Sequence, residues 1–172
     1  MYIARYKTSD KIDDILLTSD GKYLTGLYFE SSPDSRKHTG NYIEQDLPIF
    51  EETKRWLDIY FSGKEPRFTP EYKIDYKSDF QKDVIDIMNK IPYGDIAKEI
   101  AAHHHIERMS AQAVGGSVGA NPICIIVPCH RIVGASNNLT GYGGGIKNKI
   151  ALLEIEGHNL EEYKLPKEKK HE

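Results

Sequence analysis

The sequence has few cysteines, no long hydrophobic run and no strong excess of either charge. Its 172 residues include only two cysteines, Cys124 and Cys129, so there is no disulfide framework, and a chain of this length can fold without one. The longest apolar run, Ile123–Cys129, contains Pro128 and is far shorter than the ~20 residues of a membrane-spanning helix. The N-terminal residues MYIARYKTSD show no secretion signal. We therefore expect a reduced, cytoplasmic protein with no membrane partner.

Charge is spread unevenly along the chain. The formal net charge is −3, which argues weakly against nucleic acid as a partner. The segment from Lys90 to Ile150, however, contains six basic and three acidic residues and so has a surplus of positive charge. Such a segment is compatible with an ordinary solvated face or with a contact to phosphates, because DNA binding depends on local charge.

The first part of the chain is patterned as a small α/β unit. Alternating apolar residues predict strands over Ile12–Thr18 and Tyr23–Phe29, and Asp20-Gly21 between them is typical of a hairpin turn. Apolar residues at helical spacing predict a helix over Leu47–Phe61, in which Trp56 lies in the core. A linker with two prolines follows, and we place the end of this domain at residue 75.

The second part is predicted to be mainly helical. Apolar spacing indicates helices over Asp79–Asn89 and Asp95–Ala102, and Ser110 is a suitable N-cap for a third helix, Ala111–Val118. Two short helices joined by a tight connection are compatible with a helix-turn-helix, although this pattern alone is weak.

A cysteine next to a histidine stands at the end of the apolar run. We expect Ile123–Cys129 to form a buried strand that delivers Cys129, with His130 as a base and Arg131 as a positive charge beside the thiol. A helix over Lys149–Gly157 carries Glu156, whose carboxylate would orient the imidazole. The spacing leaves open the blander alternative of a structural cysteine, a solvated histidine and a surface glutamate.

Longer motifs in a fixed order decide between these alternatives. They are Ser78-Asp79-Phe80-Gln81, Ile91-Pro92-Tyr93-Gly94, Ala113-Val114-Gly115-Gly116, Asn121-Pro122, Pro128-Cys129-His130-Arg131, Thr140-Gly141-Tyr142-Gly143-Gly144 and Leu152-Leu153-Glu154-Ile155-Glu156-Gly157. Together they resemble the O6-alkylguanine-DNA alkyltransferase family, the methylated-DNA–protein-cysteine methyltransferases. The similarity is strong over residues 78–157 and weaker before them, where it rests on Thr18-Ser19-Asp20-Gly21, Leu24-Thr25-Gly26-Leu27 and residues 57–63.

The resemblance implies a two-part fold. Residues 1–75 would form an α/β, ribonuclease H-like domain with a small antiparallel sheet. Residues 76–160 would form a mainly helical domain with a winged helix-turn-helix-like DNA-binding motif, and residues 161–172 a charged tail. The protein would act as a monomer on double-stranded DNA.

The resemblance also implies DNA repair by a single, irreversible alkyl transfer. The protein would enter the minor groove and flip out the damaged guanine, because a stacked base cannot reach a buried thiol. Cys129 would take the alkyl group from O6-alkylguanine, and O4-alkylthymine is a possible second substrate. His130 would take the thiol proton through a water, Glu156 would hold His130, and Asn121 would stabilise the turn before the active-site segment.

The same resemblance assigns the DNA and base contacts. They are Tyr93, Gln112, Ala113, Gly115, Arg131, Ile132, Tyr142 and Gly143. Two positions depart from the family pattern. Gln112 stands where an arginine usually fills the gap left by the flipped base, and about six residues are missing between Tyr93-Gly94 and Asp95. Tyr93 could therefore correspond to either of two family tyrosines. We favour the second, whose hydroxyl helps to rotate the nucleotide in relatives, and a packing role for Tyr93 stays open as the alternative.

No cofactor or metal is expected. His103, His104 and His105 are consecutive and suit a solvated loop better than a metal site, and the N-terminal half has no cysteine for the zinc that some relatives bind. Two other functions stay open. One is a lesion-binding protein that does not transfer the group, although such alkyltransferase-like proteins lack the cysteine. The other is a hydrolase that uses Cys129, His130 and Glu156.

Overall fold

The computed structural model describes residues 1–31, 41–98, 118, 120–134, 139, 145–161 and 163. Its N-terminal sheet contains β1 (Tyr2–Tyr6), β2 (Ile15–Ser19), β3 (Leu24–Phe29) and β4 (Ile43–Glu44), in the order β3-β2-β1-β4. The three longer strands are antiparallel, as expected for a small antiparallel sheet. β4 adds a short parallel pairing at the edge of β1, so the sheet is mixed. The sequence analysis anticipated β2 and β3 and missed β1 and β4.

The turn between β2 and β3 shows why Asp20-Gly21 predicts a hairpin. Asp20 Oδ1 accepts hydrogen bonds from the backbone N–H groups of Lys22 and Tyr23, at 2.9 and 2.8 Å. Gly21 has a φ of 110°, a conformation that a side chain would make costly. The backbone bonds from Tyr23 and Lys22 also lower the pKa of Asp20.

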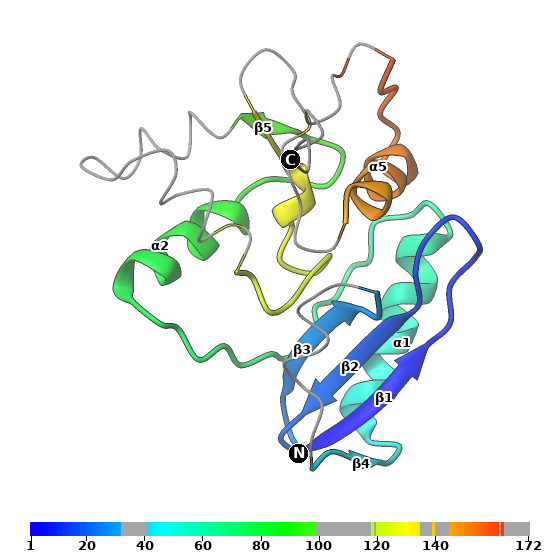
Figure 1. Cartoon of the computed structure of the whole chain (residues 1–172), viewed down its shortest axis with the longest axis vertical. Coiled ribbons are helices and arrows are strands. Elements are labelled where there is room, and N and C mark those ends of the chain that lie inside the picture. The colour runs from blue at the N-terminus through cyan, green and yellow to red at the C-terminus, as the bar shows by residue number, and fades with distance from the viewer. Residues whose placement is uncertain are drawn as a thin grey trace, which may run out of the picture.

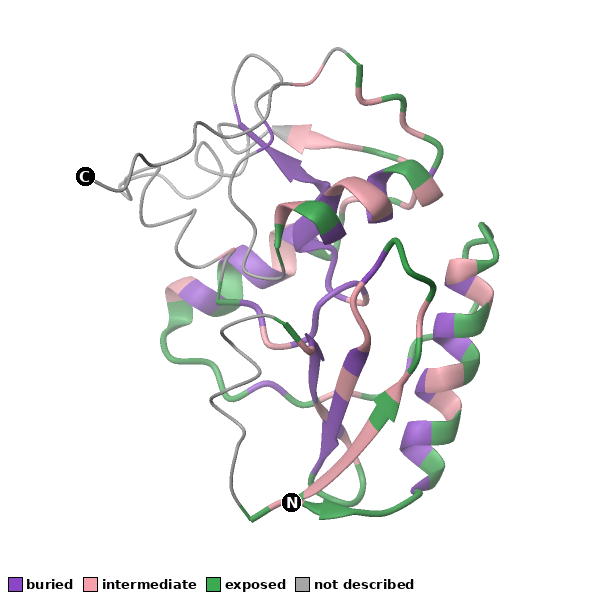
Figure 2. Ribbon diagram, turned by 45° about the vertical axis from the view of Figure 1, so that its right-hand side comes forward, coloured by how far each residue is buried: buried purple, intermediate pink, exposed green. Residues whose placement is uncertain are grey.

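One face of the sheet is covered by α1, Pro48–Phe61 (Figure 1). Pro48 is the first residue of the helix. Proline is favoured in the first helical turn because a backbone N–H at that position would have no acceptor within the helix. The buried stripe of α1 faces the sheet and includes Phe50, Leu57 and Tyr60, and Trp56 is also buried, as predicted. Figure 2 shows the buried residues along β2, β3 and one side of α1.

The second half contains α2 (Asp79–Met88), β5 (Ala97–Lys98), the 3-10 turn η2 (Cys129–Arg131), β6 (Ile132–Val133) and α5 (Ile146–Ile155). The N-cap of α2 is Ser78, whose side chain accepts from the backbone N–H of Gln81 at 3.0 Å. The prediction of a helix over residues 79–89 is confirmed. The predicted helix over residues 149–157 is confirmed in place, but it begins three residues earlier and ends at Ile155.

Two predictions for this half are wrong. Residues 95–98 of the predicted helix Asp95–Ala102 are not helical, because Ala97 and Lys98 pair in parallel with Ile132 and Val133 and supply the partner that β6 needs. The run Ile123–Cys129 is buried but is not a strand. Its chain turns at Ile125, where φ is 69°, and only Ile123 makes an isolated bridge, to Leu27. Of the predicted helix 111–118 only Val118 is described, and it is helical.

The two halves share one hydrophobic core. Leu27 at the edge of the sheet donates its N–H to Pro122 O at 2.9 Å and accepts from Cys124 N at 3.1 Å. A second link joins α5 to the loop before β2. Asn148 donates to the Asp13 carboxylate at 2.9 Å and accepts from the Asp13 backbone N–H at 3.0 Å. A third link joins α1 to the C-terminal end of α5, where the Tyr60 hydroxyl donates to Glu156 at 2.6 Å, and the candidate site lies there.

Candidate active site

Cys129, His130 and Arg131 form the single turn η2, and all three are buried. Pro128, with φ −83° and ψ 61°, makes a tight turn in which Cys129 N donates to Val127 O at 2.8 Å. Arg131 N then donates to Pro128 O at 3.1 Å. Proline has the φ that this turn requires, so the sequence Pro-Cys-His-Arg bends the chain immediately before the thiol. Cys129 and Cys124 are not joined by a disulfide.

Asn121 organises the loop that leads to Cys129. Its Oδ1 accepts from Ile123 N at 3.0 Å, and its Nδ2 donates to Val127 O at 2.9 Å. The same Nδ2 lies 3.2 Å from Sγ of Cys129. Side-chain hydrogen bonds to the loop backbone therefore replace the strand pairing that the apolar sequence predicts. An amide donor at the sulfur stabilises negative charge on it.

His130 is held by Glu156. Its Nε2 lies 2.5 Å from Oε2 of Glu156, and both side chains are fully buried. Burial lowers the pKa of His130, and Arg131 and Lys149 act in the same direction, against Glu156, which raises it. The imidazole is therefore neutral near pH 7. Because an ionised carboxylate only accepts, the ring proton lies on Nε2 and Nδ1 keeps its lone pair. Within the described residues, Nδ1 has no hydrogen-bond partner.

Glu156 is the C-cap residue of α5, and Gly157 after it has a φ of 96°. Its carboxylate accepts from four groups: His130 Nε2 and Tyr60 Oη at 2.5 and 2.6 Å on Oε2, and Arg131 Nε and Gly94 N at 2.7 and 3.0 Å on Oε1. Burial raises the pKa of Glu156, but the bonds from His130, Arg131 and Tyr60 outweigh it and hold the pKa at about 2. Glu156 is thus ionised at neutral pH.

Two further buried groups stabilise the site, and neither was predicted from the sequence. Lys149 is buried and donates from Nζ to Ile132 O at 2.6 Å. Tyr60 reaches Glu156 from α1, in the other half of the chain. Tyr60 stood out only as a member of an apolar helical stripe. The available signal was that a buried tyrosine hydroxyl needs a partner, but nothing in the sequence identifies that partner.

Tyr93 packs against Arg131 and Tyr60, two of the residues that bind Glu156. The Arg131 guanidinium stands 5.7 Å above its ring, and the ring meets Tyr60 edge-on with centroids 6.0 Å apart. Its hydroxyl is enclosed and has no partner among the described residues. These contacts show that the ring packs within the protein, and the contact of Tyr93 with DNA stays a prediction.

The structure brings together part of the predicted site. Asn121 bonds to Cys129, Glu156 bonds to His130 and Arg131, and Lys149 bonds to the carbonyl of Ile132; the consecutive residues 129–132 join these contacts into one cluster. The other predicted residues, Gln112, Ala113, Gly115, Tyr142 and Gly143, lie outside the described residues, as do the three histidines at 103–105. Among the residues the structure describes, no group of three potential ligands is placed to hold a metal ion. In the same part of the chain, no helix is long and apolar enough to cross a membrane.

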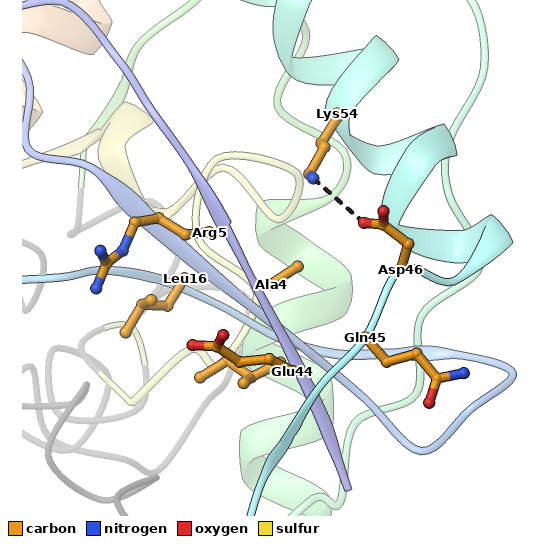
Figure 3. A pocket seen from close by; sticks show the side chains of 8 residues that line it. Ala4, Arg5, Leu16, Glu44, Gln45, Asp46 and Lys54 are labelled. Carbon is orange, nitrogen blue, oxygen red and sulfur yellow. Dashed lines mark ion pairs between the residues drawn. The ribbon is translucent and has the colours of Figure 1, made fainter.

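A groove of about 550 Å³ lies on the N-terminal sheet, away from Cys129. Residues of β1, β2 and β4 line it together with Lys54 of α1, which pairs with Asp46 at 3.9 Å (Figure 3). None of its lining residues belongs to the cluster around Glu156, and it contains no nucleophile or histidine. We therefore base the chemistry on the buried cluster and not on this groove.

Two family models cover nearly the whole chain. Residues 1–75 match the family described as 6-O-methylguanine DNA methyltransferase, ribonuclease-like domain. Residues 79–158 match 6-O-methylguanine DNA methyltransferase, DNA binding domain.

Curated relatives and solved structures agree with these matches. The methylated-DNA–protein-cysteine methyltransferase of Mycobacterium tuberculosis is 40% identical over 88% of this chain and 91% of that protein. The protein of the same name from Haemophilus influenzae is 35% identical over 83% of this chain and 79% of its own length. The crystal structure of M. tuberculosis OGT in complex with DNA superposes with a TM-score of 0.78, at 37% identity, over 91% of this chain and 92% of that one.

Proposed function

The chain belongs to the 6-O-methylguanine DNA methyltransferase family, binds DNA and repairs it by alkyl transfer, and we propose that Cys129 accepts the alkyl group from O6-alkylguanine. The observation that carries this assignment is the cluster itself. Sγ of Cys129 has an amide donor at 3.2 Å, and the next residue is a neutral histidine whose Nε2 is fixed by an ionised glutamate. A nucleophile, a base and a group that orients the base are the parts that thiol activation needs.

The proton leaves the thiol toward His130. Glu156 holds the proton on Nε2, so the Nδ1 lone pair takes the thiol proton, through a water that bridges the two groups. Asn121 Nδ2 stabilises the charge that develops on sulfur. The imidazolium that forms next to Glu156 is stabilised by the carboxylate 2.5 Å away.

The transfer itself is a displacement at the alkyl carbon. The thiolate forms the S–C bond as the C–O6 bond breaks, and the electron pair of that bond passes to the guanine. The guanine then takes up one proton at its N1, which balances the proton lost by the thiol. The product is a thioether, which has no hydrolytic route back to the thiol. Each molecule therefore reacts once, and no cofactor takes part.

The lesion has to be brought to Cys129, because this residue is only 3% exposed. We assign this step to entry through the minor groove and rotation of the damaged nucleotide out of the duplex. The contacts to DNA and base are those that the resemblance assigns: Gln112, Ala113, Gly115, Tyr142 and Gly143, with the main chain of Ile132 and the charge of Arg131. The resemblance assigns Tyr93 to these contacts as well, and its ring packs against Arg131 and Tyr60.

We further propose that the protein works as a cytoplasmic monomer built from a domain at 1–75, a domain at 76–160 and a tail at 161–172. Support comes from its two cysteines, which are not joined in a disulfide, and from a site assembled within one chain.

Intact mass spectrometry with excess O6-methylguanine duplex tests the assignment. The wild-type protein should gain one methyl group and then stop, and peptide mapping should place it on Cys129. Cys129→Ser should gain none and still bind the duplex. Cys124→Ala is the matched control, since Cys124 is the other buried cysteine, and it should react like the wild type.

The same experiment separates the alternative functions. A duplex that stays bound without any mass gain would indicate a lesion-binding protein. Continued product release from a small amount of protein would indicate a hydrolase. Methylation of Cys124 in place of Cys129 would overturn the assignment of the acceptor.

A further inference from the structure

A tyrosine of the N-terminal half donates a hydrogen bond into the Cys129 site. Tyr60 lies in the last turn of α1, is fully buried, and its hydroxyl donates to Oε2 of Glu156 at 2.6 Å across 96 residues of chain. Burial and the neighbouring Glu156 raise the pKa of Tyr60 well above its usual value. The hydroxyl therefore keeps its proton and always acts as the donor in this pair.

Tyr60 and His130 donate to the same oxygen. Oε2 of Glu156 accepts from Tyr60 at 2.6 Å and from His130 Nε2 at 2.5 Å, whereas Oε1 accepts from Arg131 and Gly94. An oxygen that already accepts one strong hydrogen bond is a weaker acceptor for the next. The Tyr60 hydroxyl thus limits how strongly Glu156 stabilises a proton on His130.

The ring of Tyr60 has little freedom to move. It stacks on Trp56 with centroids 5.4 Å apart and an interplanar angle of 7°, and it meets Phe61 and Tyr93 edge-on. The next carbonyl within reach of the hydroxyl, Leu152 O, is 3.4 Å away. Packing therefore holds the hydroxyl on Glu156.

We propose that Tyr60 is a positioning residue through which the N-terminal half sets the basicity of His130 and so the pH range in which Cys129 reacts. Its hydroxyl lies 3.4 Å from Nε2 of His130, much farther than the 2.6 Å to Oε2 of Glu156, and its ring meets the imidazole edge-on, so its effect on His130 passes mainly through Glu156. This inference rests on the proposed role of His130 as the proton acceptor. Among the described residues, the charged and titratable groups that act on Glu156 or His130 are Tyr60 on α1, Tyr93 after α2, Arg131 on η2 and Lys149 on α5.

Tyr60→Phe is the direct test, because it keeps the packed ring and removes only the hydroxyl. With one donor fewer, Oε2 of Glu156 attracts the His130 proton more strongly, and the pKa of His130 rises. Protonated His130 cannot take the thiol proton. The acidic limb of the single-turnover methyl transfer rate, measured at saturating O6-methylguanine duplex, should therefore move up by about one pH unit, the size expected for one hydrogen bond to a charged group. The pKa of His130 read from its ring ¹⁵N shifts should move by the same amount.

Tyr6→Phe is the matched control. Its hydroxyl also donates to a carboxylate of α1, Asp58, at 2.6 Å, but this pair lies away from His130. This variant should keep the acidic limb of the wild type. In a Glu156→Gln background, Tyr60→Phe should no longer move the pKa of His130, because the charge through which Tyr60 acts is gone.

The outcomes are distinguishable. A folded Tyr60→Phe protein with an unchanged acidic limb would reduce Tyr60 to a packing residue and overturn the inference, whereas absence of methyl transfer in the wild type would overturn the proposed function. If the variant does not fold, the wild type supplies the test. The Tyr60 hydroxyl proton should show a nuclear Overhauser contact to the His130 Nε2 proton, since both lie on one oxygen, and its absence would refute the shared acceptor.

Discussion

Nδ2 of Asn121 lies 3.2 Å from Sγ of Cys129 and 2.9 Å from the carbonyl oxygen of Val127. One amide thus closes the loop before the thiol and faces the thiol itself. The stability of the loop and the reactivity of the sulfur therefore depend on the same group.

Asn121→Asp removes the two hydrogen bonds that Nδ2 donates, to Val127 O and to Sγ of Cys129, and keeps the oxygen that accepts from Ile123 N. An aspartate keeps the acceptor for Ile123 N but turns a negative oxygen toward Sγ and toward Val127 O. We expect the transfer rate to fall roughly 10- to 100-fold, the effect of losing a hydrogen bond to a charged group, and the free energy of unfolding to fall by about 2 kcal/mol. Single-turnover transfer and urea unfolding measure the two effects.

Asn89→Asp is the control for this prediction. Asn89 donates to the Tyr72 hydroxyl at 3.1 Å on the exposed side of the molecule. Transfer at the wild-type rate by the Asn121→Asp protein would contradict the proposed contact with the sulfur.

Stability should fall with acid in two steps. The pKa of His130 is lowered in the folded protein, so below about pH 6.5 the unfolded chain takes up a proton that the folded one does not. This proton uptake favours the unfolded chain, and the free energy of unfolding therefore falls as the pH is lowered through this range. The pKa of Glu156 is about 2 in the folded protein against 4.5 for an ordinary glutamate, so its contribution is fully present above about pH 5 and is lost as the pH falls toward 2. The second step amounts to roughly 3 kcal/mol.

Urea unfolding at a series of pH values between 7 and 3 checks this dependence. Glu156→Gln should be less stable at pH 7 and should lose the second step. Glu154→Gln, an exposed neighbour on α5, should retain both steps. A wild-type unfolding free energy that is constant from pH 7 to pH 3 would rule out both pKa shifts.

Lys149→Met should destabilise the active-site segment. The side chain is buried, and its Nζ donates to Ile132 O at 2.6 Å. Methionine fills a similar volume but leaves that carbonyl without its donor, at a cost of about 1–3 kcal/mol. Lys147→Met, at an exposed position two residues earlier, should change the free energy of unfolding by less than ~0.5 kcal/mol. Equal losses of unfolding free energy in the two variants would show that the hydrogen bond from Lys149 to Ile132 O does not stabilise the protein.

Gln112→Arg should tighten binding to lesion duplex. This prediction rests on the resemblance, in which an arginine at this position fills the gap left by the flipped base. The added cation should also steepen the salt dependence of binding by about one phosphate contact. Gln112→Met, of similar length and without charge, should give no such gain. Identical binding isotherms for the Gln112→Arg and wild-type proteins would contradict the proposal that residue 112 fills the gap left by the flipped base.

The sequence was informative where one residue type has one physical use. Asp20-Gly21 predicts the hairpin, and apolar residues at helical spacing predict α1 and α2. The spacing of Cys129, His130 and Glu156 left an alternative open, and the resemblance decided for the cluster.

The errors arose where tertiary contacts override local pattern. β-branched residues in Ile123–Cys129 favour a strand, but Asn121 satisfies that backbone and turns it. Residues 95–98 have a helical pattern, yet pairing with β6 draws Ala97 and Lys98 into a strand. Tyr60 and Lys149 were missed because their partners lie 96 and 17 residues away, and no local spacing reveals such pairs.

The four donors to Glu156 come from α1, from the segment after α2 and from η2. They meet only when both halves of the chain have packed together. In an unfolded chain Cys129 is therefore an ordinary cysteine, with no oriented imidazole beside it. A protein that is consumed by one reaction is thus ready for alkyl transfer only after folding is complete.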